Sequence, residues 1–321
     1  MEIEKDTQRK LAVIIPCYKE SKTITSVIGD IPGIVEKIIV VDDQCPESTG
    51  KIAEKIDDPR IMVLFHMKNL GVGAAMKSGY RKALELGCDI MVKIDGDGQM
   101  DSSFLGRLIA PIVNHEADYT KGNRFHDFPD LKKMPRMRLI GNSLLSFLTK
   151  IISGYWNILD PTNGYTAISR DALEKIDLNK VADCFFFEND MLINLNIARC
   201  VVRDVPMPSR YPDEGKSSLK ITRTLRDFPL KFIMGFFRRI FYRYFIYDFN
   251  MVSIYLIVGA PLFFFGFFLG IYHWADSIIS GVPRTSGTIM LVALPIILGF
   301  QMLLQAGSLD IADVPVKNSK D

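Results

Sequence analysis

The chain of 321 residues has few of the residues that build disulfide frameworks or zinc sites. It contains five cysteines, an odd number without a C-x-x-C pair, and four scattered histidines at no metal-ligand spacing. We therefore expect reduced thiols in a cytosolic compartment. The formal net charge is only +2, so no overall basicity points to nucleic acid as a partner.

The N-terminus also lacks the apolar core that follows the basic region of a signal peptide. Residues 1–5 read Met-Glu-Ile-Glu-Lys. We therefore expect the first two hundred residues to stay on the side of the membrane where the protein is synthesised. Apolar residues concentrate instead after residue 228, where charges nearly vanish for long runs.

Short aliphatic runs alternate with segments of helical spacing in the N-terminal part. The expected strands are Leu11–Ile15, Ile38–Val41, Ile61–Phe65 and Ile90–Ile94, and the expected helices include Ile24–Ile28, Thr49–Ile56 and Ala74–Leu86. This order predicts an α/β fold with a mostly parallel sheet. Ligands of such sheets bind beyond the carboxyl ends of the strands. One rim should therefore carry three polar loops, Pro16–Glu20, Asp42-Asp43 and Asp95–Gln99.

Two carboxylates follow the fourth expected strand. Asp95 and Asp97 are separated by one residue, so they leave the strand on the same face. Together with the amide oxygen of Gln99 they offer an all-oxygen site suited to Mg²⁺ or Mn²⁺, with positions left for a diphosphate. Gly96 and Gly98 allow a tight turn or the close approach of a ligand. The alternative is an ordinary polar turn after a strand.

Two phosphate-binding motifs are present only in part. Gly71-Val72-Gly73 resembles the start of a dinucleotide fingerprint, but its third glycine is misplaced at Gly79. Residues 215–217 end like a P-loop, but the earlier glycine position holds Arg210. We interpret both as ordinary loop or helix-packing glycines.

A basic aromatic segment precedes the apolar C-terminal part. From Lys216 to Asp248 there are eight Lys or Arg and two acidic residues, and aromatic residues recur at spacings of three and four. This pattern predicts a basic amphipathic helix in a membrane interface, where Arg238, Arg239 and Arg243 would gather anionic lipids. The alternative is an aromatic face buried in the protein core.

Two apolar runs follow this segment. Val252–Tyr272 has 21 residues without a charge, about 31 Å as a helix, which is enough to span a bilayer core. Thr288–Leu304 forms the second run, and Tyr272 and Trp274 would mark an aromatic belt. The two runs predict a multi-pass hairpin in the cytoplasmic membrane. The basic segment before the first run should stay inside, which makes both termini and the catalytic part cytosolic. A buried helix pair of a globular protein is the alternative.

In their order along the chain, these residues resemble glycosyltransferase family 2. The motifs are Pro16-Cys17-Tyr18-Lys19-Glu20, Val41-Asp42-Asp43, Asp95-Gly96-Asp97-Gly98-Gln99, Lys121-Gly122-Asn123-Arg124 and Asp160-Pro161-Thr162-Asn163-Gly164-Tyr165. The last two are similar to the branch that contains dolichyl-phosphate mannose synthase and bacterial polyprenyl-phosphate glycosyltransferases. The resemblance covers roughly residues 10–210 and implies a GT-A fold, that of nucleotide-diphospho-sugar transferases.

The resemblance also implies roles for single residues. The nucleotide sugar would be contacted by Pro16, Tyr18, Glu20, Asp42 and Asp95. The divalent metal that bridges its diphosphate would be held by Asp95, Asp97 and Gln99. Arg124 and Arg138 match arginines that face the acceptor phosphate, a task suited to the planar donors of guanidinium.

Several carboxylates are candidates for the catalytic residues. Asp97 would act through the metal, whereas Asp160, Glu188 and Asp190 compete for the acceptor side, where each could be a base or could orient a loop or an arginine. A hydroxyl acceptor needs a base, but a lipid phosphate is already ionised at neutral pH and needs little help.

Two departures from the family pattern matter. The usual Asp-Asp-x-Ser-x-Asp run reads Asp42-Asp43-Gln44-Cys45-Pro46-Glu47, which leaves the base and sugar specificity open. The Arg-Trp motif of processive polysaccharide synthases is absent, because neither Trp156 nor Trp274 follows an arginine. We therefore expect the transfer of a single sugar.

These observations predict a GT-A catalytic domain (1–215), juxtamembrane amphipathic helices (216–250), a transmembrane hairpin (251–309) and a cytosolic tail (310–321). The predicted activity is inverting transfer from a nucleotide-diphosphate sugar to undecaprenyl or dolichyl phosphate. The expected partners include membrane lipids, and homo-oligomerisation is left open. One alternative is a transferase of the same fold that acts on a hydroxyl of a glycolipid or glycan. The other is a membrane protein that binds nucleotide sugars without catalysis.

Overall fold

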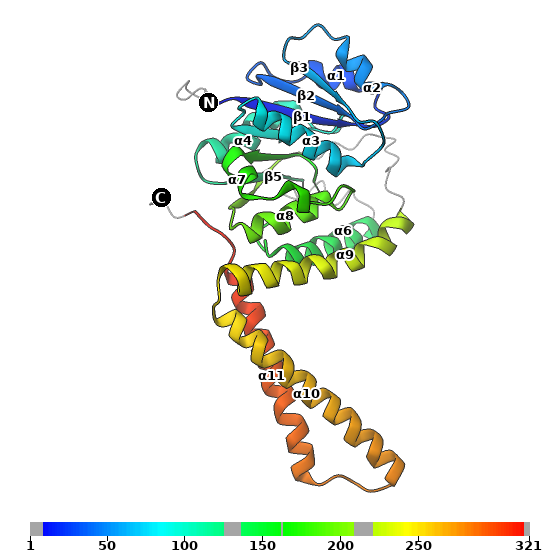
Figure 1. The fold of residues 1–321 in the computed structure, drawn as a ribbon, viewed down its shortest axis with the longest axis vertical. Coiled ribbons are helices and arrows are strands. Elements are labelled where there is room, and N and C mark those ends of the chain that lie inside the picture. The colour runs from blue at the N-terminus through cyan, green and yellow to red at the C-terminus, as the bar shows by residue number, and fades with distance from the viewer. Residues whose placement is uncertain (1–8, 125–135, 162, 209–220, 318–321) are drawn as a thin grey trace. The chain divides into compact units, whose positions relative to one another are not determined.

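The computed structural model describes residues 9–124, 136–161, 163–208 and 221–317, and among these the side chains of 136–140, 142 and 221–228 are not described. The chain divides into two compact units, one of Met1–Arg239 with Pro315–Asp321 and one of Ile240–Val314 (Figure 1). Each unit is described by itself. The four-part division expected from the sequence stays a prediction.

A seven-stranded sheet organises the first unit. Its strands are β1 (Leu11–Cys17), β2 (Lys37–Asp42), β3 (Ile61–Phe65), β4 (Ile90–Lys93), β5 (Tyr119–Asn123), β6 (Thr166–Ser169) and β7 (Val202–Pro206), in the order β3-β2-β1-β4-β6-β5-β7. β1 pairs in parallel with β2 and β4, as do β2 with β3 and β5 with β7. Only β6 runs antiparallel, to β4 and to β5. The predicted mostly parallel sheet is confirmed.

The helices of the first unit cover both faces of this sheet or pack beside it. They are α1 (Ile24–Gly29), α2 (Thr49–Glu54), α3 (Val72–Glu85), η1 (Ser102–Phe104), α4 (Leu105–Val113), α6 (Arg136–Ser153), α7 (Arg170–Lys175), η2 (Leu178–Lys180), α8 (Phe187–Ile197) and α9 (Ile221–Phe241). Val13 and Ile15 of β1 share one buried cluster with side chains of α1 and α4. Ile14 points to the other face, where it packs against Gly79 of α3. Burial of each such side chain contributes about 1.5–3 kcal/mol.

The register of the central strands sets the position of the polar loops. In the β1–β2 pair Cys17 lies opposite Asp42, and in the β1–β4 pair Ile14 lies opposite Lys93. All three strands point the same way, so the loops that follow them leave the sheet at one edge. This edge is the rim predicted from the sequence.

Arg239 of α9 is used inside the protein, which corrects the expectation that it gathers lipid at the surface. Arg239 is 1% exposed and donates to the carbonyl oxygens of Ile151 (3.1 Å) and Ile152 (2.8 Å). These carbonyls belong to the last turn of α6, whose acceptors have no partners within the helix. Figure 1 shows α6 and α9 side by side. Among the described side chains of α9, the large exposed ones are apolar, namely Leu230, Ile233, Met234, Phe237 and Phe241.

The second unit is a pair of long apolar helices, α10 (Met251–Ser280) and α11 (Ser286–Ala312), preceded by the π-helical turn η3 (Tyr242–Tyr247). Both helices are long and apolar enough to cross a membrane, and only 11% and 6% of their most apolar windows are buried. This low burial disfavours the alternative of a globular core pair. Gly299 allows the helices to approach closely, because a Cβ there would lie 2.5 Å from the backbone nitrogen of Phe263.

Polar contacts connect η3 to the C-terminal end of α11. Arg243 is 1% exposed and binds the carboxylate of Asp313 at 2.6 Å, and the hydroxyl of Tyr244 donates to Asp310 at 2.6 Å. Arg243, like Arg239, is therefore engaged within the protein and does not lie at a lipid-facing surface as expected.

Candidate active site

Three carboxylates meet at the rim beyond β1 and β4. The turn after β4 is fixed by Asp97, whose Oδ1 accepts the backbone N–H of Gln99 at 3.0 Å, and by Thr23, whose hydroxyl donates to the carbonyl of Gly96 at 2.6 Å. Glu20 packs against Gly96 so closely that a Cβ at this position would collide with its Oε2. Glycine at position 96 therefore lets Glu20 lie beside the Asp95–Asp97 turn.

The electrostatics of this cluster favour a bound cation. Burial, together with the nearby charges of Asp95 and Asp97, raises the pKa of Glu20 to about 8. Its Oε2 is buried and accepts no hydrogen bond from the described part of the chain. Crowded carboxylates with an unsatisfied oxygen are the donor set that Mg²⁺ or Mn²⁺ prefers.

The described residues contain no group of three or more His, Cys, Asp or Glu side chains arranged as a complete metal site. This finding is compatible with a substrate-completed site, because Mg²⁺ is usually held by one or two carboxylates plus substrate phosphates. Asp95 and Asp97 fit this requirement. Gln99 is exposed, and its assignment as a ligand stays a prediction.

A lysine not considered in the sequence analysis links two of the predicted carboxylates. Lys93, at 2% exposure, lies 2.9 Å from Asp95 and 3.0 Å from Glu188. Burial alone would lower the pKa of Lys93, but these two carboxylates raise it. A Cβ on Gly164 would lie 2.5 Å from the Lys93 Nζ, so the Asn163–Tyr165 loop closes over the pair. The signal for Lys93 was its place at the end of the expected strand, directly before the Asp95–Asp97 turn.

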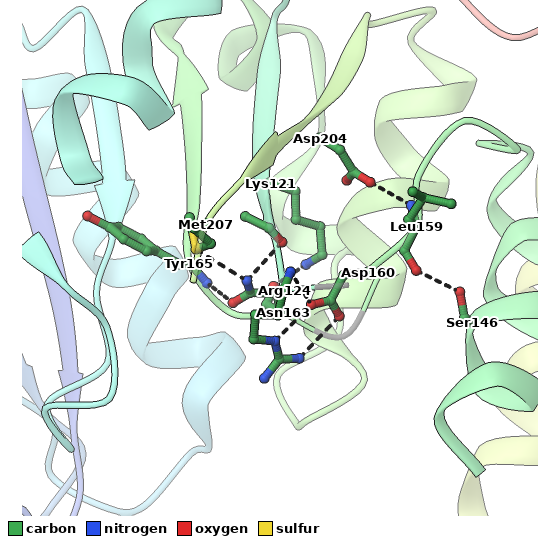
Figure 2. A network of polar contacts seen from close by, with 10 residues as sticks. Lys121, Arg124, Ser146, Leu159, Asp160, Asn163, Tyr165, Asp204 and Met207 are labelled. Carbon is green, nitrogen blue, oxygen red and sulfur yellow. Dashed lines mark hydrogen bonds and ion pairs between the residues drawn. The ribbon is translucent and has the colours of Figure 1, made fainter. Parts of the chain in front are cut away.

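A second ion pair lies at the acceptor side predicted from the resemblance. The guanidinium of Arg124 binds both oxygens of Asp160, through Nε at 2.8 Å and Nη2 at 3.1 Å (Figure 2). Asp160 is fully buried, whereas 34% of the Arg124 side chain is exposed. The carboxylate therefore orients the guanidinium of a part-exposed side chain.

The loop between these two ion pairs is tied down by buried polar groups. Lys121 of β5 donates to the carbonyl of Asn163, and the Asn163 amide donates to the carbonyl of Gly122 at 2.8 Å (Figure 2). The Asn163 side-chain oxygen accepts the N–H of Tyr165 at 3.0 Å. Buried groups satisfied in this way hold a loop in one conformation.

Two predicted acceptor-side residues lie apart from this arrangement or outside the described side chains. The carboxylate of Asp190 binds Arg238 of α9 and accepts the N–H of Ala182 at 2.8 Å. Asp190 thus connects α8 to α9, and its catalytic role stays a prediction. Arg138 lies in α6, but its side chain is outside the described residues.

The predicted nucleotide side lies beyond β1 and β2. Asp42 is buried, and its carboxylate accepts the N–H groups of Cys45 (2.6 Å) and Gly50 (2.7 Å). Pro16 is buried at the end of β1, whereas Tyr18 is 44% exposed beside the rim. Contacts of these residues with a nucleotide stay a prediction.

The structure explains the departure from the Asp-Asp-x-Ser-x-Asp pattern. The Cys45 sulfur accepts the N–H of Lys19 at 3.0 Å and lies 3.1 Å from the Thr49 hydroxyl. Lys19 has a positive φ of 66°. Cysteine at position 45 thus supplies the acceptor that a serine hydroxyl would supply. Glu47 binds the Ser21 hydroxyl at 2.5 Å.

The glycines of the rejected dinucleotide fingerprint have a packing role, as predicted. Gly71 has a φ of 97°, and a Cβ there would lie 2.6 Å from the carbonyl oxygen of Asp183. Its N–H and that of Leu70 bind the Asp43 carboxylate at 2.7 Å and 2.9 Å. The partial P-loop motif at 215–217 lies outside the described residues.

Comparison with known proteins places these features in a family. The sequence model described as Glycosyl transferase family 2 matches residues 12–177. Over 216 residues the chain is 30% identical to the UDP-N-acetylglucosamine–dolichyl-phosphate N-acetylglucosaminyltransferase of Methanococcus voltae, covering 63% of this chain and 86% of that protein. It is 33% identical over 180 residues to the polyprenol monophosphomannose synthase of Mycolicibacterium smegmatis, covering 54% and 67%.

A similar fold occurs in a solved structure. Glucosyl-3-phosphoglycerate synthase from Mycobacterium tuberculosis, crystallised with Mn²⁺, UDP and glucosyl-3-phosphoglycerate, matches with a TM-score of 0.50 and 21% sequence identity. The match covers 72% of this chain and 80% of that one. At this identity the similarity concerns the fold.

Proposed function

The chain belongs to glycosyl transferase family 2, and we propose that it moves one sugar from a nucleotide-diphosphate sugar to a polyprenyl phosphate with inversion at the anomeric carbon. It is a glycosyltransferase of the GT-A fold. The names of its curated relatives include dolichyl phosphate and polyprenol, which supports a polyprenyl acceptor. The sugar and the base of the donor are left open.

The observation that carries this proposal is the Arg124–Asp160 pair. A lipid phosphate must approach the donor diphosphate, and two anions repel each other. The Arg124 side chain is part exposed, and its guanidinium is fixed by two hydrogen bonds to a buried carboxylate. Such a group can grip two oxygens of a phosphate. In this reading Arg124 neutralises and orients the acceptor, and Arg138 is a second proposed counter-charge.

The electrostatics of Glu188 support a phosphate acceptor over a hydroxyl acceptor. Burial alone would raise the pKa of Glu188, but Lys93 and Lys121 lower it. A carboxylate stabilised in its ionised form is a weak general base for a hydroxyl. The phosphate oxygen is already ionised, so it can attack the anomeric carbon without losing a proton. Lys93 then serves to hold Glu188 and Asp95 in place.

The leaving group is the nucleoside diphosphate. Asp95 and Asp97 would hold the divalent cation, and this cation supplies stabilisation of the negative charge that develops on the diphosphate. Glu20 and Asp42 would contact the nucleoside. The structural relative crystallised with Mn²⁺ and UDP supports this part of the proposal.

We also propose that α10 and α11 span the cytoplasmic membrane as a hairpin with the catalytic unit on the cytosolic side. The length and apolar surface of both helices support the anchor, and the cytosolic location of nucleotide sugars supports the orientation.

The proposal is tested by incubating the purified full-length protein with a panel of labelled nucleotide sugars, polyprenyl phosphate and Mg²⁺ or Mn²⁺. We expect label in the lipid fraction for at least one donor, and its loss on chelation or in Asp97→Ala. Asp97 is a rim residue that adds little to the core, so this variant should stay folded, with a melting temperature lowered only by the loss of its hydrogen bond to the Gln99 N–H. Asp57→Ala, at an exposed carboxylate of the same unit, is the matched control and should retain turnover. Full turnover in Asp97→Ala and after chelation would refute the metal assignment.

A further inference from the structure

The backbone of Leu159, the residue before Asp160, is held from two sides by side chains of distant elements. The N–H of Leu159 donates to Oδ2 of Asp204 in β7 at 2.6 Å, and its carbonyl accepts the Ser146 hydroxyl of α6 at 3.0 Å (Figure 2). No regular secondary structure includes Leu159. These two bonds therefore define where the chain enters the Asp160 loop.

The position of Leu159 determines the position of the next residue, Asp160. Asp160 is fully buried, and it contacts Arg124 through both carboxylate oxygens and accepts the Arg124 N–H at 3.2 Å. The Cα atoms of adjacent residues are about 3.8 Å apart, so a shift of Leu159 moves Asp160 by a similar amount. The direction of the Arg124 guanidinium thus depends on where Leu159 is held.

Burial disfavours the charged form of Asp204. Its Oδ1 is buried and accepts no hydrogen bond from the described residues. Burial raises the pKa of Asp204 to about 6; Asp160 also raises it, while the Leu159 N–H, Lys121 of β5 and Lys150 of α6 lower it. Within the described residues, the hydrogen bond of the Asp204 carboxylate is to the backbone N–H of Leu159.

We infer that Asp204, with Ser146, is a positioning residue for the acceptor phosphate, acting through Leu159 and Asp160 on the guanidinium of Arg124. Neither residue touches the reacting atoms. This inference rests on the proposed role of Arg124 and adds the residues that set its direction. It predicts a defect in acceptor use with no matching defect in donor use.

The experiment measures KM for polyprenyl phosphate and for the nucleotide sugar in Asp204→Ala, Ser146→Ala and Asp204→Asn of the full-length protein. One hydrogen bond is worth about 0.5–1.5 kcal/mol, so the acceptor KM should rise up to about tenfold in the alanine variants. The donor KM should stay within about twofold on the same scale. Asp204→Asn keeps an acceptor oxygen for the Leu159 N–H, so it should restore most of the acceptor KM at neutral pH.

A pH profile separates positioning from a merely structural role. Below pH 6 Asp204 becomes protonated and loses the charge that strengthens its bond to Leu159. The wild-type acceptor KM should therefore rise more steeply below this pH than that of Asp204→Asn. The acceptor phosphate titrates in both proteins, so the difference between the two profiles reports Asp204.

Two controls make the outcome decisive. Arg203→Gln changes the neighbouring exposed residue of β7, which pairs with Glu116, and should leave both KM values unchanged. Arg124→Lys removes the bidentate grip and should raise the acceptor KM. If Arg124→Lys raises it and the Asp204 and Ser146 variants do not, the inference is overturned and the proposed function stands. If Arg124→Lys has no effect either, the acceptor role of Arg124 fails as well.

Discussion

Glu20 is a buried carboxylate on which the charges of two other carboxylates, Asp95 and Asp97, act. Its pKa of about 8 results from burial and from Asp95 and Asp97. Between its ordinary pKa and this value the folded protein binds a proton that the unfolded chain has released. Stability then falls as pH rises, because the folded state holds more protons than the unfolded state.

We therefore expect the metal-free protein to lose stability between about pH 4.5 and pH 8, with a slope of at most about 1.4 kcal/mol per pH unit from this one group. Glu20→Gln should flatten the slope. Mn²⁺ should raise the melting temperature more at pH 8 than at pH 6, because an ionised cluster binds the cation better. Thermal unfolding of both proteins across this range checks the prediction. Parallel pH profiles for wild type and Glu20→Gln would contradict it.

At this scale the sequence predicts local relations and misses distant ones. The end of the fourth aliphatic run correctly places Asp95 and Asp97 at the rim, although β4 ends at Lys93 and both aspartates follow the strand and do not alternate along it. The Arg124–Asp160 pair spans 36 residues of sequence, and no periodicity reports such a contact. The sequence therefore offers Arg124 and Asp160 as separate candidates, whereas the structure makes them one unit.

The sequence also predicts most helices and strands but not the distant contacts between them. The four parallel strands of the N-terminal half are predicted from aliphatic runs between helices. β6 is only four residues long and runs antiparallel between β4 and β5, a direction that composition does not encode. In α9 the aromatic spacing correctly indicates a helix. The sequence cannot show that Arg239 is bound by the end of α6, because that partner lies 87 residues away.

Close packing of α10 and α11 gives a prediction at the scale of elements. Gly299→Leu should force the helices apart, because a Cβ already lies 2.5 Å from the nitrogen of Phe263 and 2.8 Å from the carbonyl of Gly259. Overpacking of this kind costs about 1–3 kcal/mol. Thermal unfolding of the full-length protein in detergent measures the loss. Gly307→Leu on the same helix, where nothing lies within 4 Å, is the control, and equal losses in the two variants would show that the contact is unimportant.

The chain combines a catalytic unit of the GT-A fold with a pair of helices long and apolar enough to cross a membrane. A polyprenyl phosphate unites both environments, since its chain is apolar and its headgroup is a dianion that Arg124 could bind. The central claim is that the sugar is attached to this phosphate and not to a hydroxyl.

Phosphorus NMR of the product tests this claim most directly. Purified full-length protein is given its nucleotide sugar and polyprenyl phosphate, and the lipid fraction is extracted after the label has been transferred. We predict that the monoester resonance of the acceptor is replaced by a diester resonance, with one diester formed for each sugar incorporated. We also predict that mild acid releases the sugar. Lipid-bound sugar accompanied by an unchanged monoester resonance and resistance to mild acid would contradict the account and indicate a hydroxyl acceptor.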